Sequence, residues 1–266
     1  MICFPNAKIN LGLHILSKRT DGYHNIETVF YPVNLCDALE IVPAPEGKTV
    51  FTQTGIPVSG TPEDNLVMKA YCLLKKDFDI PKITIYLRKK IPFGAGLGGG
   101  SSDAAFMIKL LNNYADLKLS LEQMETYAAQ IGADCPFFIQ NKPVFAEGIG
   151  NIFSPLTVSL QNYHLVVVKP SVSVSTKEAY AQVKPQKPVA PLREIISLPV
   201  GEWKNNLIND FEPGVFALYP EIAEIKQRLY AEGALYASMS GSGSAVFGIF
   251  DKPMRLEWEG VLNVEK

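Results

Sequence analysis

A glycine-rich stretch, Ile-Pro-Phe-Gly-Ala-Gly-Leu-Gly-Gly-Gly-Ser-Ser-Asp-Ala-Ala, occupies residues 91–105 of this chain. Five of the seven positions from Gly94 to Gly100 are glycine. Glycine is costly to order, but it allows positive φ and lets backbone N–H groups approach a ligand closely. The apolar spacing after Ser102 predicts a helix, and a glycine loop that leads into a helix N-terminus suits a polyphosphate. The alternative is a structural turn capped by Ser101 or Ser102.

The loop does not fit the common nucleotide-binding motifs. Residues 94–99 satisfy the dinucleotide pattern G-x-G-x-x-G, but no strand ending in an acidic residue follows about 20 residues later. No lysine follows the glycines, so the P-loop pattern also fails, and the His-Arg-Asp and Asp-Phe-Gly elements of protein kinases do not occur. The sequence predicts a phosphate-binding loop that belongs to none of these classes.

Two further segments carry residues suited to chemistry. Residues 6–16 alternate between apolar and polar, which predicts a strand with Lys8, Asn10 and His14 on its polar face. A second glycine run, Ser-Gly-Ser-Gly-Ser, occupies residues 240–244 between two predicted strands. Taken alone, a lysine on a strand face is most often solvated, His14 and His164 are read as structural, and a serine–glycine run is often a hairpin loop.

Composition restricts the class of protein. The chain has 266 residues, of which 47% are hydrophobic and 20% charged, as expected for an ordinary globular core in one large or two moderate domains. The net charge of −2 gives no electrostatic reason to expect nucleic acid or an anionic membrane as a partner. With no signal peptide or membrane-length apolar run, and four scattered cysteines without a C-x-x-C pair, the sequence predicts a cytoplasmic protein with reduced thiols.

Strands and helices alternate irregularly along the chain. Strands are predicted over residues 6–16, 27–35, 39–42, 49–52, 83–87, 144–147, 163–169, 234–239 and 245–250. Helices are predicted over 65–78, from 102 onward, over 120–131 with a Ser120–Gln123 capping box, and over 220–232. The absence of strict βαβ repetition favours an α+β fold. Glycine and proline punctuation near residue 150 predicts two domains, 1–155 and 156–266.

The order of these segments resembles the superfamily of galactokinase, homoserine kinase, mevalonate kinase and phosphomevalonate kinase, whose nucleotide loop is matched by residues 92–102. Within that superfamily, six motifs of this chain resemble those of the kinases that act on 4-diphosphocytidyl-2-C-methyl-D-erythritol in the non-mevalonate isoprenoid pathway. The motifs lie at residues 5–11, 21–24, 132–138, 146–150, 209–213 and 239–247, so the resemblance covers nearly the whole chain. It implies a two-domain α+β small-molecule kinase fold with the active site in the interdomain cleft.

The resemblance also implies residue roles. The family's catalytic lysine falls on Lys8 and its catalytic aspartate on Asp134. Residues that hold the cytidine and methylerythritol parts fall on Asn10, Tyr23, His24 and Phe30. The nucleotide-binding set is Asn65, Leu66, Lys89, Pro92, Phe93, Gly94, Ala95, Gly96, Leu97, Gly98, Gly99, Gly100, Ser101 and Ser102. ATP is the expected co-substrate, with Mg²⁺ on the nucleotide and no metal-binding site of the protein's own.

These residue types fit phosphoryl transfer to an alcohol on chemical grounds as well. The reaction needs the triphosphate held in line, its charge neutralised, and the proton of the hydroxyl accepted, here by Asp134. Two alternatives remain: a mevalonate- or homoserine-type kinase, and a non-catalytic nucleotide-binding regulator, which would be expected to have lost Lys8 or Asp134. Asp103 could contact Mg²⁺ through water or simply favour the helix N-terminus. The sequence gives no indication of oligomeric state.

Overall fold

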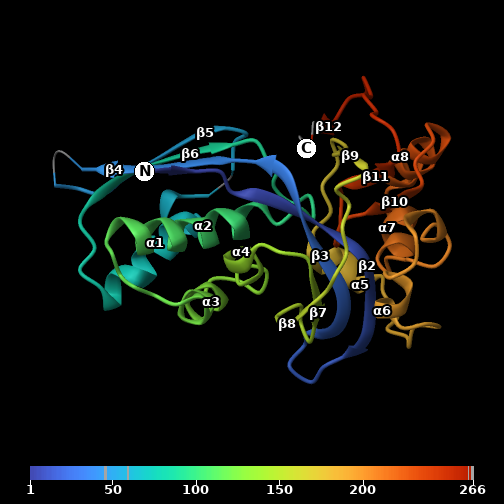
Figure 1. Ribbon diagram of the computed structural model, residues 1–266, viewed down its shortest axis with the longest axis horizontal. Helices are drawn as coiled ribbons and strands as arrows, with labels where there is room; N and C mark the ends of the chain where they lie inside the picture. Colours follow the sequence, from blue (N-terminus) through green and yellow to red (C-terminus); the bar gives the residue numbers. More distant parts are fainter. Residues whose placement is uncertain (45–46, 59, 263, 265–266) are drawn as a thin grey trace. The chain divides into compact units, whose positions relative to one another are not determined.

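Three four-stranded sheets and a set of mostly short helices make up the chain, which the computed structural model describes over residues 1–44, 47–58, 60–262 and 264 (Figure 1). The strand orders are β1-β4-β6-β5, β2-β3-β7-β8 and β10-β11-β9-β12. Helices and strands intermix along the chain without repeated βαβ units. This arrangement confirms the predicted α+β class.

The chain divides into two compact units that interleave in sequence. Unit 1 consists of residues Met1–Ala7, Leu35–Phe93 and Gly98–Lys142. Unit 2 consists of residues Lys8–Asn34, Gly94–Leu97 and Pro143–Lys266. The glycine loop therefore contributes to both units, and so does the strand that carries Lys8. A single division of the chain after residue 155 stays a prediction.

Unit 1 is a sheet with helices packed against it. Its strands are β1 (Ile2–Cys3), β4 (Ala38–Pro43), β6 (Ile83–Lys89) and β5 (Val50–Gly55), with β5 parallel to β6 and the other pairs antiparallel. The longer helices α1 (Leu66–Asp77) and α2 (Gly99–Tyr114) pack together, and α2 also contacts β1 and β4. The short η1 (Pro62–Asp64), α3 (Leu121–Ala129) and α4 (Phe137–Gln140) complete the unit. Its core includes Leu39, Ile41, Ile83, Ile85, Leu74 and Ile108.

Unit 2 contains an antiparallel sheet formed by β10 (Tyr236–Met239), β11 (Val246–Phe250), β9 (His164–Val168) and β12 (Val261–Leu262). Helix α8 (Pro220–Ala231) packs on β10 and β11 and is accompanied by α7 (Glu212–Leu218). The remaining short helices are α5 (Thr176–Ala181), α6 (Leu192–Ile195) and η2 (Val200–Glu202). One apolar cluster joins these elements and includes Leu13, Val166, Phe211, Val215, Leu229 and Val246.

The remaining sheet contains β2 (Asn6–Lys18), β3 (His24–Cys36), β7 (Val144–Glu147) and β8 (Ile152–Pro155). The alternation over residues 6–16 predicts one apolar and one polar face, but every residue of β2 from Asn6 to Ile15 is buried. Lys8 is 4% exposed and Asn10 2%. Buried polar groups of this kind need hydrogen-bond partners, and those partners belong to the candidate site described below.

Helix starts follow local capping chemistry. Asn65 caps α1 by accepting a hydrogen bond from Val67 N (2.9 Å), and the predicted Ser120–Gln123 capping box is present at α3. Helix α2 begins at Gly99, earlier than predicted, and its N-cap is Gly98 in the left-handed region. The alternative of a serine cap is therefore wrong, because both serines lie inside the first turn of the helix.

Two expectations from composition concern the membrane and the thiols. Among the residues the structure describes, no helix combines the length and the apolar character needed to cross a bilayer. None of the four cysteines, all of which the structure describes, forms a disulfide bond, and Cys72 alone among them is exposed. Burial raises the pKa of the Cys135 thiol to about 12, which keeps it protonated and unreactive at neutral pH.

Candidate active site

The glycine loop adopts a backbone that few residues other than glycine tolerate. Gly94, Gly96 and Gly98 have φ values of +61°, +74° and +70°. Gly98 places the first turn of α2 directly after the loop, where Ser102 N donates to Gly98 O at 2.9 Å. No side chain caps the start of this helix. Its first-turn amides and the positive end of its dipole therefore form the kind of site that binds phosphate groups.

A pocket of about 460 Å³ lies in unit 1 beside this helix start. Among its lining residues are six of those predicted to bind the nucleotide, namely Asn65, Leu66, Lys89, Pro92, Phe93 and Gly100. Thr61, Asp64 and Asp103 also line it. Pockets of this size hold small-molecule ligands. The structure thus brings together residues at the start of α1, at the end of β6, in the glycine loop and on α2 that the sequence analysis had grouped as one nucleotide site, and adds Thr61 and Asp64 at η1, which it had not predicted.

Lys89 is held at the wall of this pocket by two buried carboxylates. Its Nζ donates to Asp37 Oδ2 and, at 2.6 Å, to Asp103 Oδ2. Asp37 Oδ1 in turn accepts the backbone amides of Lys90 (2.5 Å) and Ile91 (2.8 Å), so this carboxylate also fixes the entry to the glycine loop. Neither carboxylate had been assigned this role from the sequence, which offered only magnesium or the helix dipole as partners for Asp103.

The electrostatics of this cluster are dominated by burial. Burial raises the pKa of the Asp103 carboxyl to about 8, against the opposing pull of Lys89. For Lys89 burial lowers the pKa, but attraction by the two carboxylates outweighs it and the net shift is upward. Two carboxylates therefore share one ammonium group, and Asp103 Oδ1 is buried without a hydrogen-bond partner.

Lys8 lies in a separate group of contacts within unit 2. Its Nζ donates to Asn10 Oδ1 at 2.6 Å and to Gly96 O at 3.0 Å. The same ammonium group lies 5.0 Å from the centre of the Phe30 ring, a cation–π distance. Lys8 is therefore a buried and oriented charge, which contradicts the simpler interpretation of a solvated lysine on a strand face.

A chain of hydrogen bonds behind Lys8 fixes its partner Asn10. Asn10 Nδ2 donates to Thr28 Oγ1 at 2.9 Å, and Thr28 Oγ1 donates to Gly12 O at 2.6 Å. Thr28 is fully buried on β3. Sequence reasoning missed Thr28, because a threonine in a strand carries no signal of its own until its neighbour across the sheet is known.

The second glycine run contacts the first through unit 2. Ser240 Oγ donates to Gly96 O at 2.9 Å, so this carbonyl accepts from both Ser240 and Lys8. A Cβ added to Gly96 would lie 1.9 Å from Ser240 O, which shows that the two backbones are in direct contact. Ala245 N also donates to Ala95 O at 3.1 Å. The residues 94–97 and 240–245, far apart in sequence, are thus locked together beside Lys8.

The residues predicted to hold the substrate base lie at a turn in unit 2. Asp21 Oδ1 accepts from Tyr23 N (3.0 Å), as in the predicted Asp-Gly turn, and the Tyr23 side chain is 61% exposed. The His24 ring stacks on Tyr180 with 4.6 Å between ring centres and 17° between planes. Burial lowers the pKa of His24, which favours the neutral ring. Tyr180, on α5, was not anticipated from the sequence.

The roles of two predicted site residues, Phe30 and Asp134, stay predictions. Phe30 is only 3% exposed, and its ring lies under Lys8, so its contact with a substrate stays a prediction. Asp134 lies in unit 1 on the turn before α4 and is half-buried. Its role as a base also stays a prediction. Within the described part of the chain, no cluster of three or more histidine, cysteine or carboxylate side chains could hold a metal ion.

Comparisons with known proteins identify the fold family. The model of the GHMP kinase N-terminal domain matches residues 65–142, and that of the GHMP kinase C-terminal domain matches residues 199–257. The fold is similar to that of a crystal structure of the Methanococcus jannaschii mevalonate kinase, with a TM-score of 0.68 and 14% sequence identity. The alignment covers 94% of this chain and 90% of the mevalonate kinase chain. The fold is therefore that of the GHMP kinases.

Closer relatives narrow the assignment. A protein named 4-diphosphocytidyl-2-C-methyl-D-erythritol kinase from Azobacteroides pseudotrichonymphae is 60% identical over 96% of this chain and 95% of its own length. One with the same name from Bacteroides fragilis is 60% identical over 97% of this chain and 96% of its own. A crystal structure titled 4-(cytidine 5'-diphospho)-2C-methyl-D-erythritol kinase has a TM-score of 0.80 at 33% identity and covers 94% of this chain and 90% of its own. The chain belongs to the 4-diphosphocytidyl-2-C-methyl-D-erythritol kinase family.

Proposed function

We propose that this chain transfers the γ-phosphoryl group of ATP to the 2-hydroxyl of 4-diphosphocytidyl-2-C-methyl-D-erythritol, a step of the non-mevalonate isoprenoid pathway. The observation that carries the proposal is 60% identity over 96% of the chain to a relative of that name. The retained glycine loops and the buried lysine support a catalytic protein rather than a regulator that has lost its chemistry.

The nucleotide is assigned to the pocket of unit 1 and the start of α2. The pocket lined by Asn65, Leu66 and Lys89 takes the base and sugar, and the first-turn amides from Gly99 onward bind the phosphates. Because the described residues form no metal cluster of their own, Mg²⁺ would be held chiefly by phosphate oxygens, as is usual for this ion. When bound, the ion neutralises charge on the β- and γ-phosphates.

Lys8 and Asp134 are assigned to the transfer step. The ammonium group of Lys8, fixed by Asn10 and Gly96, stabilises the negative charge that develops on the attacking oxygen. The carboxylate of Asp134 accepts the proton that the substrate hydroxyl loses. Direct transfer of this kind needs no covalent phospho-enzyme, because the bond from the γ-phosphorus to the hydroxyl oxygen forms as the bond to the leaving ADP oxygen breaks.

The cytidine end of the substrate is assigned to the turn after β2. Tyr23 offers an exposed aromatic ring, and the neighbouring His24 lies face to face with Tyr180. Aromatic faces stack on nucleobases, and each such stack contributes roughly 1–3 kcal/mol in single-stranded nucleic-acid complexes. Asn10, which lies on β2 with Lys8, is assigned together with His24 to hydrogen bonds with the polar edge of the base.

The proposal is tested by coupled ADP release with three alcohols: the cytidyl methylerythritol, mevalonate and homoserine. We expect turnover with the first alone. The variant Asp134→Asn should keep ATP binding and lose about 100-fold or more in turnover, the range for a positioned general base. Asp79→Asn, an exposed carboxylate in the same unit, is the matched control and should turn over normally.

Each other outcome selects an alternative. Preferred turnover of mevalonate or homoserine would make the chain a kinase of another type in the superfamily. Binding of ATP without ADP release from any alcohol would make it a nucleotide-binding regulator. Near-normal turnover of Asp134→Asn would remove the assignment of the base while leaving the substrate assignment in place.

A further inference from the structure

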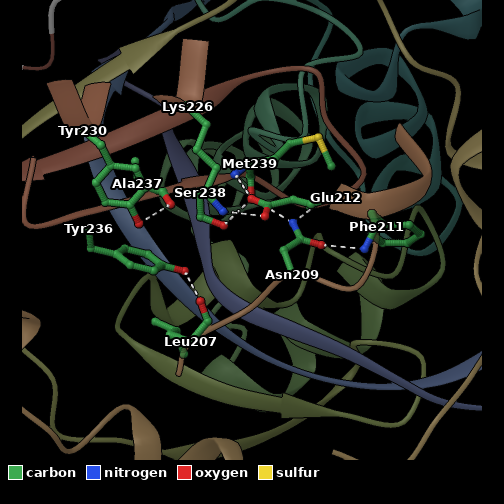
Figure 2. A network of polar contacts seen from close by, with 11 residues as sticks. Leu207, Asn209, Phe211, Glu212, Lys226, Tyr230, Tyr236, Ala237, Ser238 and Met239 are labelled. Carbon is green, nitrogen blue, oxygen red and sulfur yellow. Dashed lines mark hydrogen bonds and ion pairs between the residues drawn. The ribbon is translucent and has the colours of Figure 1, made fainter. Parts of the chain in front are cut away.

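The second glycine run is held from behind by a single buried asparagine. Asn209 Nδ2 donates to Met239 O at 2.8 Å and to Gly241 O at 2.9 Å, and these carbonyls lie on either side of Ser240. Asn209 Oδ1 accepts from Phe211 N at 3.0 Å, a contact visible in Figure 2. The side chain is 2% exposed. Both amide hydrogens are thus committed to one three-residue segment of backbone.

Glu212, three residues further on, holds the preceding part of the same segment. Its Oε1 accepts from Met239 N (2.8 Å) and Ser238 Oγ (3.0 Å), and Lys226 Nζ donates to its Oε2 at 2.5 Å (Figure 2). A buried carboxylate is tolerated only when its charge is compensated and its oxygens are hydrogen-bonded. We refer to Asn209 and Glu212 together as the loop clamp.

The loop clamp is itself attached to the strand that carries Lys8. Leu13 N donates to Ile208 O and Asp210 N donates to Leu13 O, both at 2.9 Å, in a parallel bridge between Leu13 and Asn209. The backbone around Asn209 therefore pairs with β2, while the Asn209 side chain binds the carbonyls on either side of Ser240. All of these residues lie in unit 2.

The gripped segment is the one that contacts the first glycine loop. Ser240 Oγ donates to Gly96 O, the carbonyl that also accepts from Lys8 Nζ. Gly241 is close enough that a Cβ would lie 3.2 Å from Asn10 Oδ1 and 3.5 Å from Gly96 O. A shift of residues 239–241 would therefore be passed directly to Gly96 and to the two groups that orient the Lys8 ammonium.

We infer that Asn209 and Glu212 are positioning residues for phosphoryl transfer, which hold the second glycine run in register with β2 and so fix Gly96 and Lys8. The inference rests on the function proposed above. It assigns these two residues a role in catalysis without any contact with either substrate. Misplacement of reacting groups by about 1 Å can cost on the order of 100-fold in rate.

The test is the variant Asn209→Asp, which keeps the shape of the side chain but replaces both N–H donors by an acceptor facing two carbonyls. Asn206→Asp, an exposed asparagine on the same segment, is the matched control. Amide exchange of the peptide covering residues 240–245 should become about 10- to 100-fold faster in Asn209→Asp, as expected for the loss of two neutral hydrogen bonds. Turnover per folded molecule should fall about 10- to 100-fold, with the Michaelis constant for the cytidyl alcohol changed by less than about twofold.

The outcomes separate a positioning role from a merely structural one. A purely structural residue would lower the melting temperature and the folded fraction while leaving turnover per folded molecule and loop exchange unchanged, and that result overturns the inference. If Asn209→Asp does not fold, Asn209→Ser removes the same two donors without adding charge and is measured in the same way. Failure of the proposed function shows instead as absence of ADP release in the unmodified protein. In that case the exchange measurement still reports whether the clamp holds the loop, and unchanged exchange overturns the inference by itself.

Discussion

Thr28 offers a sharp test of how the buried Lys8 is held in position. Its hydroxyl accepts from Asn10 Nδ2 at 2.9 Å and donates to Gly12 O at 2.6 Å, in a position with no exposed surface. The variant Thr28→Val keeps the volume of the side chain and removes only the hydroxyl. One amide hydrogen of Asn10 and the Gly12 carbonyl then lose this buried partner.

The expected loss of stability follows from those two groups. A buried polar group left unsatisfied costs about 1–3 kcal/mol, so two give about 2–6 kcal/mol, and local relaxation favours the lower half of that range. For a chain of this length 1 kcal/mol lowers the melting temperature by roughly 2–4 °C, so a loss of about 2–4 kcal/mol should lower the midpoint of thermal unfolding, followed by circular dichroism, by about 4–16 °C. Turnover should fall about tenfold, because Asn10 is then free to turn away from Lys8.

The matched variant is Thr28→Ser, which keeps the hydroxyl and removes one buried methyl group. Loss of a methyl group costs about 1 kcal/mol. We therefore expect Thr28→Ser to be the more stable and more active of the two variants. If the serine variant is instead less stable than the valine variant, packing rather than hydrogen bonding holds this position, and the explanation of how Lys8 is oriented is wrong.

Two more predictions concern the pocket of unit 1 and its assignment to the nucleotide. In Gly99→Val the new Cβ would lie 2.8 Å from Ile91 Cγ2 and 3.3 Å from Lys89 Nζ, so the Michaelis constant for ATP should rise about tenfold or more while that for the alcohol changes little; unchanged ATP affinity by calorimetry would contradict this. Burial raises the pKa of Asp103 to about 8, so between its ordinary value of 3.8 and about 8 the folded chain keeps a proton that the unfolded chain has released. We compare the free energy of unfolding of the unmodified protein with that of Asp103→Asn by urea unfolding. The value for the unmodified protein minus that for the variant should decrease, by at most ~1.4 kcal/mol per pH unit, from about pH 5 to about pH 8, and a difference that increases with pH would contradict the raised pKa of Asp103.

Much of the local structure was predictable because it depends on neighbours in sequence. The capping box at Ser120, the turn at Asp21 and the strand over Ile83–Leu87 all follow from spacings of a few residues, and the structure has each of them. The glycine loop was recognisable for the same reason. Only its junction with α2 was misplaced: Gly98, with φ +70°, caps the helix without using a side chain.

The supports of the site could not be predicted, because they join residues that are distant in sequence. Lys89 is neutralised by Asp37, 52 residues away, and Asn209 binds the carbonyl of Gly241, 32 residues away. Alternation along β2 predicted a polar face but not its burial, because the partner of Asn10 is Thr28 on the neighbouring strand. A single sequence shows which residues are unusual, but not which distant partner satisfies each buried polar group.

Because the chain is synthesised from its N-terminus, β2 is made long before the residues that it binds near residue 210. Ile15 N donates to the Asp210 carboxylate across a sequence separation of 195 residues, and Ser240 reaches Gly96 across 144. At a synthesis rate of about 5–20 residues per second, the strand that carries Lys8 waits roughly 10–40 s for its partner near residue 210 to be made. Unit 1 can be completed much earlier, since all of its residues precede 143. A nascent chain can therefore complete the pocket of unit 1, with Lys89 already held by Asp37 and Asp103, before Ser240 is made and can bind the Gly96 carbonyl beside Lys8.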